Sequence, residues 1–125
     1  MRFLGSLGAL YGLCGVAIGA FAAHVLAERL SVRSQELIET GVRYQLVHAL
    51  ALLVAVWMAG TSEGSAGPFR WAAALFAAGV PLFAGSLYLL ALGAPSALGG
   101  ITPIGGLLFL AGWLALAVGA WRAGG

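Results

Sequence analysis

Four long apolar runs alternate with polar or turn-rich breaks along the chain. The runs cover about residues 3–26, 42–60, 71–92 and 104–121, and each is close to the roughly 20 helical residues that cross a bilayer core. Gly, Pro and Ser mark two of the breaks, at 61–68 and 93–100. The pattern predicts an all-α fold, an integral membrane four-helix bundle that forms one domain over residues 1–125.

The third break, residues 27–41, differs because it is charged yet keeps apolar residues such as Leu37 and Ile38. Ser31 is of a type that caps helix N-termini, so one prediction is a helix that starts near Val32 and continues into the second crossing. The alternative is an amphipathic connector helix that lies on the membrane surface.

Small residues recur at spacings of three and four along the first run, which places them on one side of a helix. In lipid such a stripe lets another helix approach closely. We predict that the stripe packs along its length against a helix of this chain or of a second copy. Its members are Gly5, Gly8, Gly12, Gly15, Gly19 and Ala22. In the fourth run Gly105, Gly112 and Gly119 recur every seven residues and repeat the pattern more weakly.

Two prolines lie in or at the start of the later runs. Pro81 falls inside the third run, so it should kink that helix and leave the carbonyl of Ala77 without its usual helical partner. At the start of the fourth run, Thr102 is a plausible N-cap and Pro103 fits the first helical position.

Composition agrees with a chain that lies almost wholly in the bilayer. Hydrophobic residues make up 62% and charged residues 8%, whereas soluble domains carry about 25% charged residues. The formal net charge of +2 is too small and scattered to predict nucleic-acid binding. The single cysteine, Cys14, is expected to be a small apolar residue. Since no nucleophile with a base, acid pair or metal-ligand cluster is evident, the sequence predicts no enzyme, no metal site and no cofactor.

Four crossings would place Met1, Glu63 and Gly125 on one side of the membrane, called side A, and residues 27–41 and 93–103 on the other, side B. The arginines divide equally between the sides: Arg2, Arg70 and Arg122 on side A, and Arg29, Arg33 and Arg43 on side B. The positive-inside rule is therefore tied, and the N-terminal amine favours cytoplasmic termini. We expect a multi-pass protein of the bacterial inner membrane.

Unusual polar residues gather near side B. Glu39 and Arg43 are four residues apart, in the favourable order for an ion pair on a helix. His48 lies about one turn inside the second run, where polar side chains usually face the bundle interior and often mark function. We predict one connected cluster, either a structural latch or a binding site for a lipid headgroup or small polar ligand. Its members are His24, Glu39, Arg43, Tyr44, Gln45, His48, Thr102, Pro103, Gly105 and Gly106.

Three segments together resemble one known family. They are residues 19–24, residues 39–50 with Tyr44-Gln45 and His48, and residues 101–106 with Thr102-Pro103 and Gly105-Gly106, followed by Gly112-Trp113. In this order they are similar to the family catalogued as domain of unknown function 423, which includes transmembrane protein 256-like proteins. The resemblance implies the membrane fold and the location of the site, and it supplies no reaction.

These features favour a membrane-embedded accessory, assembly or scaffold protein in contact with membrane lipids. A thin four-helix interior also favours a homo-oligomer or a larger membrane complex. One alternative is binding or transport of a lipid or a small polar or anionic ligand by an oligomer. A weaker alternative is haem held by His24 and His48.

Overall fold

The computed structural model describes residues 1–124, which form helices and turns without any strand. Four helical segments in this range are long and apolar enough to cross a membrane: Arg2–Leu26, Val32–Thr61, Ala66–Ala91 and Ser96–Gly124. The predicted all-α membrane fold with four crossings is therefore confirmed. The predicted domain of residues 1–125 ends at Gly125, which lies outside the described residues.

Most crossings are built from more than one helical element. The first is α1 (Arg2–Phe21) with a π-helical turn, η1 (Ala22–Leu26), and the second is α2 (Val32–Thr61). The third joins α3 (Ala66–Val80), a π-helical turn η2 (Pro81–Gly85) and α4 (Ser86–Ala91). A 3₁₀ helix, η3 (Ser96–Gly100), precedes α5 (Thr102–Gly124). All four helices begin before the apolar runs, at Arg2, Val32, Ala66 and Thr102.

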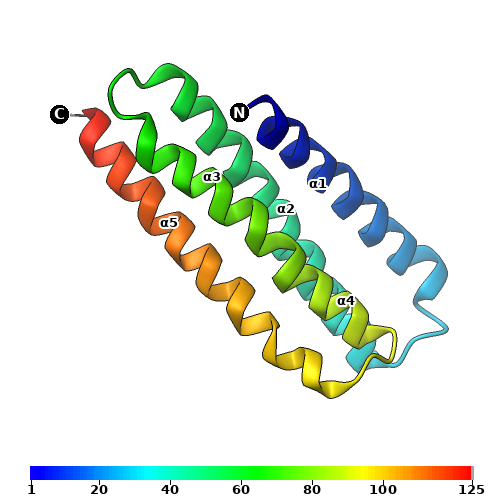
Figure 1. Cartoon of the computed structure of the whole chain (residues 1–125). Helices are drawn as coiled ribbons and strands as arrows, with labels where there is room; N and C mark the ends of the chain where they lie inside the picture. Colours follow the sequence, from blue (N-terminus) through cyan, green and yellow to red (C-terminus); the bar gives the residue numbers. More distant parts are fainter. Residues whose placement is uncertain (125) are drawn as a thin grey trace.

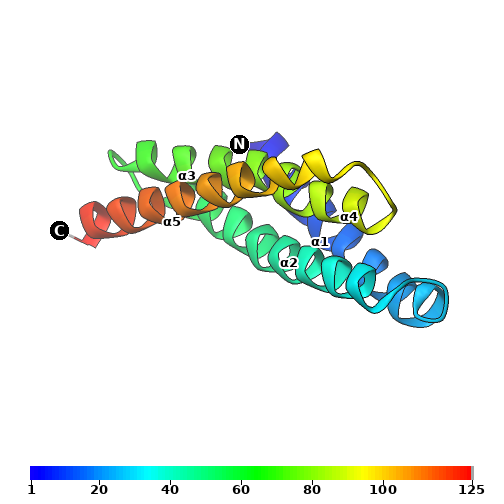
Figure 2. The ribbon, with the colours of Figure 1, turned by 90° about the horizontal axis from the view of Figure 1, so that it is seen from below.

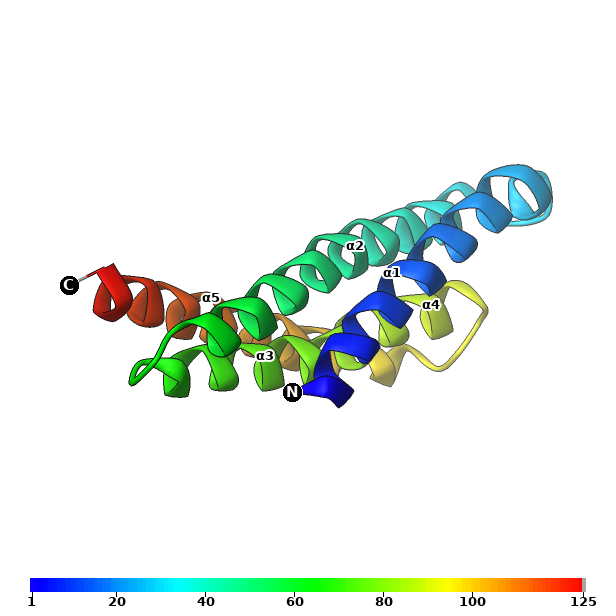
Figure 3. The ribbon, with the colours of Figure 1, turned by 90° about the horizontal axis from the view of Figure 1, so that it is seen from above.

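The crossings pack in the order α1, α2, α3, α5. Figure 1 shows α1 and α5 at opposite edges, with α2 and α3 between them. Seen from below, α3 and α5 lie on one side of α2 (Figure 2), and from above α1 runs alongside α2 (Figure 3). The N-terminus, the α2–α3 connection and the end of α5 lie toward one end of the bundle (Figure 1). The arrangement is the one that four crossings require.

The structure of residues 27–41 decides between the two alternatives, a helix capped by Ser31 that enters the membrane and a helix that lies on the membrane surface. Ser31 is the N-cap of α2, and its hydroxyl oxygen accepts a hydrogen bond from the Ser34 N–H at 3.1 Å. From Val32 the helix continues without a break to Thr61. At about 1.5 Å per residue, its 30 residues span about 45 Å. The surface-helix alternative is wrong, because the cap begins one helix that also crosses the membrane.

The glycine stripe of α1 faces α2, but not along its whole length. Gly8 and Gly15 are buried, and a methyl group added to Gly15 would lie 2.7 Å from a methyl carbon of Leu46. Added methyl groups on Gly5 and Gly19 would contact Val56 and Val42. Gly12 differs, since no atom lies within 4 Å of the position that its Cβ would take. The prediction of packing along the full stripe is therefore wrong at Gly12, which opens onto a groove beside α2.

Two glycines of α5 receive phenylalanine rings from the third crossing, and a third lies against the backbone of a phenylalanine. Phe69, Phe76 and Phe83 are spaced by seven residues, like the glycines that they meet. Added methyl groups on Gly119 and Gly112 would lie 2.7 and 2.6 Å from ring atoms of Phe69 and Phe76. At Gly105 the added group would lie 2.5 Å from the backbone nitrogen of Phe83. The matched spacing brings α3, η2 and α5 close together in antiparallel directions, an arrangement that small residues permit.

Pro81 begins the wide turn η2. Because proline has no N–H, it cannot supply the helical hydrogen bond that the Ala77 carbonyl would normally receive. The Tyr11 hydroxyl of α1 donates to this carbonyl oxygen at 2.7 Å. The carbonyl predicted to be freed by Pro81 is therefore present, and it links α1 to α3.

The predicted cap of α5 is wrong. Thr102 is already the first residue of the helix, and the carbonyl of the preceding Ile101 accepts from the Ile104 and Gly105 N–H groups. The Thr102 side chain instead pairs with the Ser86 hydroxyl, with their oxygens 2.6 Å apart. Pro103 is consequently the second helical residue, where its missing N–H still costs no helical hydrogen bond.

Candidate functional site

Three exposed tryptophans at the side A end give the depth of the interior groups. Trp57, Trp71 and Trp121 are 65, 68 and 86% exposed, and tryptophan is enriched at membrane–water interfaces. Along α2, His48 lies about 14 Å from Trp57 at 1.5 Å per residue. Since the hydrocarbon core is about 30 Å thick, His48 lies near its middle.

His48 is 4% exposed, and both of its ring nitrogens have partners. Its Nδ1 donates to the carbonyl oxygen of Tyr44, one turn earlier on α2, at 2.7 Å. Its Nε2 accepts from the indole N–H of Trp113 on α5 at 3.0 Å. Because a carbonyl only accepts and an indole only donates, these partners require neutral imidazole with its proton on Nδ1.

Aromatic rings surround this imidazole. Phe109 stacks on it with ring centroids 3.6 Å apart, and the Tyr44 ring is almost parallel to it at 6.0 Å. Phe76 and Trp113 lie at 5.6 and 5.8 Å in tilted and edge-on orientations. The rings come from α2, α3 and α5, so His48 lies where these three helices meet.

Gln45 is the centre of a second interior network. It is 4% exposed, and its Nε2 donates to the backbone carbonyl of Tyr11 at 2.8 Å. Its Oε1 accepts from the Tyr88 hydroxyl at 2.7 Å. The same Tyr11 bonds Ala77 through its own hydroxyl, so hydrogen bonds join α1, α2, α3 and α4.

A third polar contact lies toward side B. Ser86 donates to the Phe83 carbonyl oxygen at 2.9 Å, so its own oxygen is the acceptor for the Thr102 hydroxyl at 2.6 Å. Phe83 also packs against Tyr44 with ring centroids 4.7 Å apart. These contacts place the start of α5 against η2 and α4.

The residues predicted to form one cluster therefore occupy different places. Gln45 and His48 lie in the interior, whereas Tyr44 is 41% exposed. Gly105 and Thr102 contact η2 and α4. The hydrogen-bond partners of His48 are Tyr44 and Trp113, so no hydrogen bond of His48 reaches the Thr102–Gly106 part of the predicted cluster. Pro103 is exposed and Gly106 is half-buried beside the Phe83 ring. His24, Glu39 and Arg43 are exposed residues of η1 and α2 and stand apart from the interior networks.

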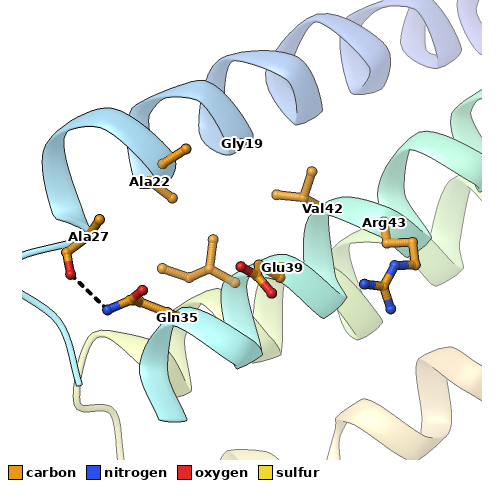
Figure 4. A pocket seen from close by; sticks show the side chains of 9 residues that line it. Gly19, Ala22, Ala27, Gln35, Glu39, Val42 and Arg43 are labelled. Carbon is orange, nitrogen blue, oxygen red and sulfur yellow. Dashed lines mark hydrogen bonds between the residues drawn. The ribbon is translucent and has the colours of Figure 1, made fainter. Parts of the chain in front are cut away.

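A pocket of about 490 Å³ lies near side B between α1, η1 and α2. Figure 4 shows Gln35, Glu39 and Arg43 in a row along α2, opposite Gly19 and Ala22. The hydrogen bond marked among these lining residues runs from Gln35 Nε2 to the Ala27 carbonyl oxygen at 2.8 Å. The ion pair predicted between Glu39 and Arg43 is absent among them. The pocket thus holds an acid and a base that do not bond each other.

The donor chemistry does not fit the haem alternative. Iron would need a ring nitrogen of His48, but Nδ1 is bonded to Tyr44 and Nε2 to Trp113. Displacing Trp113 would leave its indole N–H without a partner in the apolar interior, at a cost in free energy. Within residues 1–124, no three His, Cys, Asp or Glu side chains are placed to hold a metal ion.

The sequence interpretation missed several interior partners. Trp113 appears only as part of the family motif, and Tyr11 and Phe109 not at all. One usable signal is Pro81, because the freed Ala77 carbonyl needs a donor. The other is the spacing of Phe69, Phe76 and Phe83, which equals the spacing of the α5 glycines.

Comparison with known proteins adds a family. A family model described as "Protein of unknown function (DUF423)" matches residues 18–106. A UPF0382 membrane protein of Staphylococcus haemolyticus is 43% identical over 98% of each chain. The UPF0382 inner membrane protein YgdD of Escherichia coli K12 is 38% identical and covers 97% of this chain and 91% of its own. No solved structure matches.

Proposed function

Because this chain belongs to the DUF423 family of membrane proteins of unknown function, we propose its function from its own geometry: a non-catalytic accessory protein of the bacterial inner membrane. It provides a preassembled four-helix unit against which another membrane protein packs. The relatives are named as membrane and inner membrane proteins, so the location follows from the family. The accessory role is our proposal.

The observation that carries the proposal is the satisfied interior. Among the described residues, no buried side-chain nitrogen or oxygen lacks a hydrogen-bond partner. Gln45, His48 and Ser86 are the buried polar side chains, and each is engaged by other parts of the chain. Interior polar groups of membrane proteins often mark a substrate or ion pathway, but here each of them is bonded to another part of the chain. This interior uses its polar groups to join helices.

The first helix favours a partner on its outer side. Of its residues only Gly8 and Gly15 are buried, whereas nine residues of α2 are. α1 packs on α2 and lies at the edge of the bundle (Figure 1). The opposite side of α1 carries exposed apolar residues such as Phe3 and Leu10. We propose that this side contacts a second copy or a different membrane protein.

Site-specific photocrosslinking in intact membranes tests the proposal. A photoreactive residue at Leu10 should give one discrete protein adduct, and mass spectrometry of that adduct identifies a second copy or another protein. Leu114 of α5, which is 67% exposed, is the matched control and should react mainly with lipid. Lipid adducts alone at Leu10, or the same protein adduct at both positions, would contradict a partner specific to α1.

A further inference from the structure

We propose that the pocket between α1, η1 and α2 binds the headgroup of one class of lipid, a zwitterionic phospholipid with a primary ammonium group, as in phosphatidylethanolamine. The phosphate lies against Arg43 and the ammonium group against Glu39. This site is separate from the outer side of α1, so the lipid proposal does not depend on the accessory role.

The first argument is the state of the two charged side chains. Glu39 and Arg43 are one helical turn apart, a spacing at which such residues commonly pair. Both line the pocket, yet no hydrogen bond joins them (Figure 4). Each therefore keeps its hydrogen-bonding capacity for an external group. Gln35 is already occupied, since its Nε2 donates to the carbonyls of Ala27 and Leu30.

The second argument is the order of the charges along the membrane normal. α2 runs from side B toward side A, so Arg43 lies deeper than Glu39 by about 6 Å, one helical turn. In an ethanolamine phospholipid the phosphate lies next to the glycerol, and the ammonium group lies two carbons farther toward water. The base and the acid of the pocket are thus stacked in the same order as the anion and cation of the lipid.

The third argument is space and depth. The wall opposite the charges consists of Gly19, Ala22, Ala23 and Ala27, whose small side chains leave the volume of about 490 Å³. Arg43 lies about 21 Å along α2 from Trp57, within the roughly 30 Å core. A charged side chain at this depth reaches outward toward the headgroup layer or pairs with an opposite charge. A lipid phosphate supplies that charge.

The same arrangement disfavours the other common headgroups. An anionic glycerol headgroup would place no cation beside the Glu39 carboxylate. A choline headgroup carries a cation but no N–H, so it cannot donate a hydrogen bond to that carboxylate. The primary ammonium group brings both a positive charge and N–H donors to the carboxylate, whereas the glycerol headgroup offers only neutral hydroxyl donors and the choline headgroup offers no donor.

Lipid titration by native mass spectrometry tests the site on the delipidated full chain. Phosphatidylethanolamine, phosphatidylglycerol and phosphatidylcholine with identical acyl chains are compared. We expect the ethanolamine lipid to bind about tenfold more tightly than the other two, a difference of about 1.4 kcal/mol. Equal binding of all three lipids, or tighter binding of phosphatidylglycerol, would overturn the proposal.

Variants assign the two charges. Glu39→Gln should abolish the ethanolamine preference and keep general phospholipid binding, while Arg43→Gln should weaken binding of all three lipids. Glu36→Gln and Arg33→Gln are matched controls, because both residues are exposed on α2 and do not line the pocket. All four changes are at exposed positions, and circular dichroism verifies the helical fold. Retained preference in Glu39→Gln, or an equal loss in the controls, would refute the site.

Discussion

His48 shows how one polar side chain is accommodated in the middle of a membrane protein. Both ring nitrogens are bonded, one within α2 and the other to α5, and stacked rings fill the remaining space around the imidazole. An unbonded polar atom at this depth would cost free energy that no water offsets. His48 therefore joins α2 to α5 through the hydrogen bond that it accepts from the Trp113 indole.

We predict that Trp113→Phe lowers the free energy of unfolding by about 1 kcal/mol, in the range measured for interhelical hydrogen bonds in membranes. The change keeps an aromatic ring but leaves His48 Nε2 without its donor. Reversible unfolding in mixed micelles gives the value. Trp121→Phe on the same helix is the control, since Trp121 is 86% exposed; equal effects at both positions would show that the indole N–H is not what matters.

Substitutions at Gly12 and Gly15 test whether close contact with α2, and not the presence of glycine alone, stabilises the packing of α1. We predict that Gly15→Leu destabilises the chain, because its side chain would meet Leu46 and the Gln45 amide that bonds Tyr11. Gly12→Leu should be tolerated, since the space beside Gly12 is open. Thermal unfolding in detergent compares the two variants. A larger loss for Gly12→Leu would mean that its groove is filled in the native assembly.

At the scale of elements, the third and fourth crossings are joined by rings that lie over glycines. Phe69 and Phe76 are fully buried, and their rings occupy the places where side chains on Gly119 and Gly112 would be. Neither helix could approach the other so closely with ordinary residues at these positions. The seven-residue spacing of the phenylalanines thus has its structural meaning only together with the same spacing of the glycines on α5.

Two adjacent glycines of α5 should respond oppositely to alanine. A Cβ on Gly105 would lie 2.8 Å from the Cα of Phe83, and backbone cannot move aside cheaply, whereas a Cβ on Gly106 finds its nearest atoms at 3.9 Å. We predict a loss of about 1–3 kcal/mol for Gly105→Ala, as for other overpacked sites. Gly106→Ala should be neutral or slightly stabilising, because alanine is the better helix former. Paired unfolding curves would contradict this if the two variants were alike.

At the scale of the whole molecule, sequence accounts for more of the fold than of the site. The apolar runs predict four crossings, and Ser31 predicts the start of α2. Pro81 predicts which carbonyl is freed, although not that Tyr11 fills it. The site is harder because topology tells only which membrane side a residue is near. His48 is on the second crossing and Thr102 on the fourth, and the orientation of α5 places Trp113 against His48 and Thr102 against Ser86.

We predict that both termini are cytoplasmic. An even number of crossings places them on one side, and the N-terminal amine adds positive charge to the side that holds Arg2, Arg70 and Arg122. A cytoplasm-active reporter should work at either terminus, and a periplasm-active reporter should work when inserted after Ala94. Opposite locations for the two termini would contradict the fold, and periplasmic activity at both would reverse the orientation.

The equal spacing of phenylalanines and glycines also creates an ambiguity that the chain must remove. If α5 slid by seven residues, about 10 Å along its axis, two of the three phenylalanines would still lie opposite a glycine. Apolar packing alone thus leaves alternative alignments close in energy. After such a slide, Ala120 or Gly106 would replace Trp113 beside His48, and Phe109 or Pro95 would replace Thr102 beside Ser86. None of these side chains can hydrogen-bond. The few interior polar contacts therefore choose among alignments, giving the chain a single folded arrangement where its most regular feature would permit several.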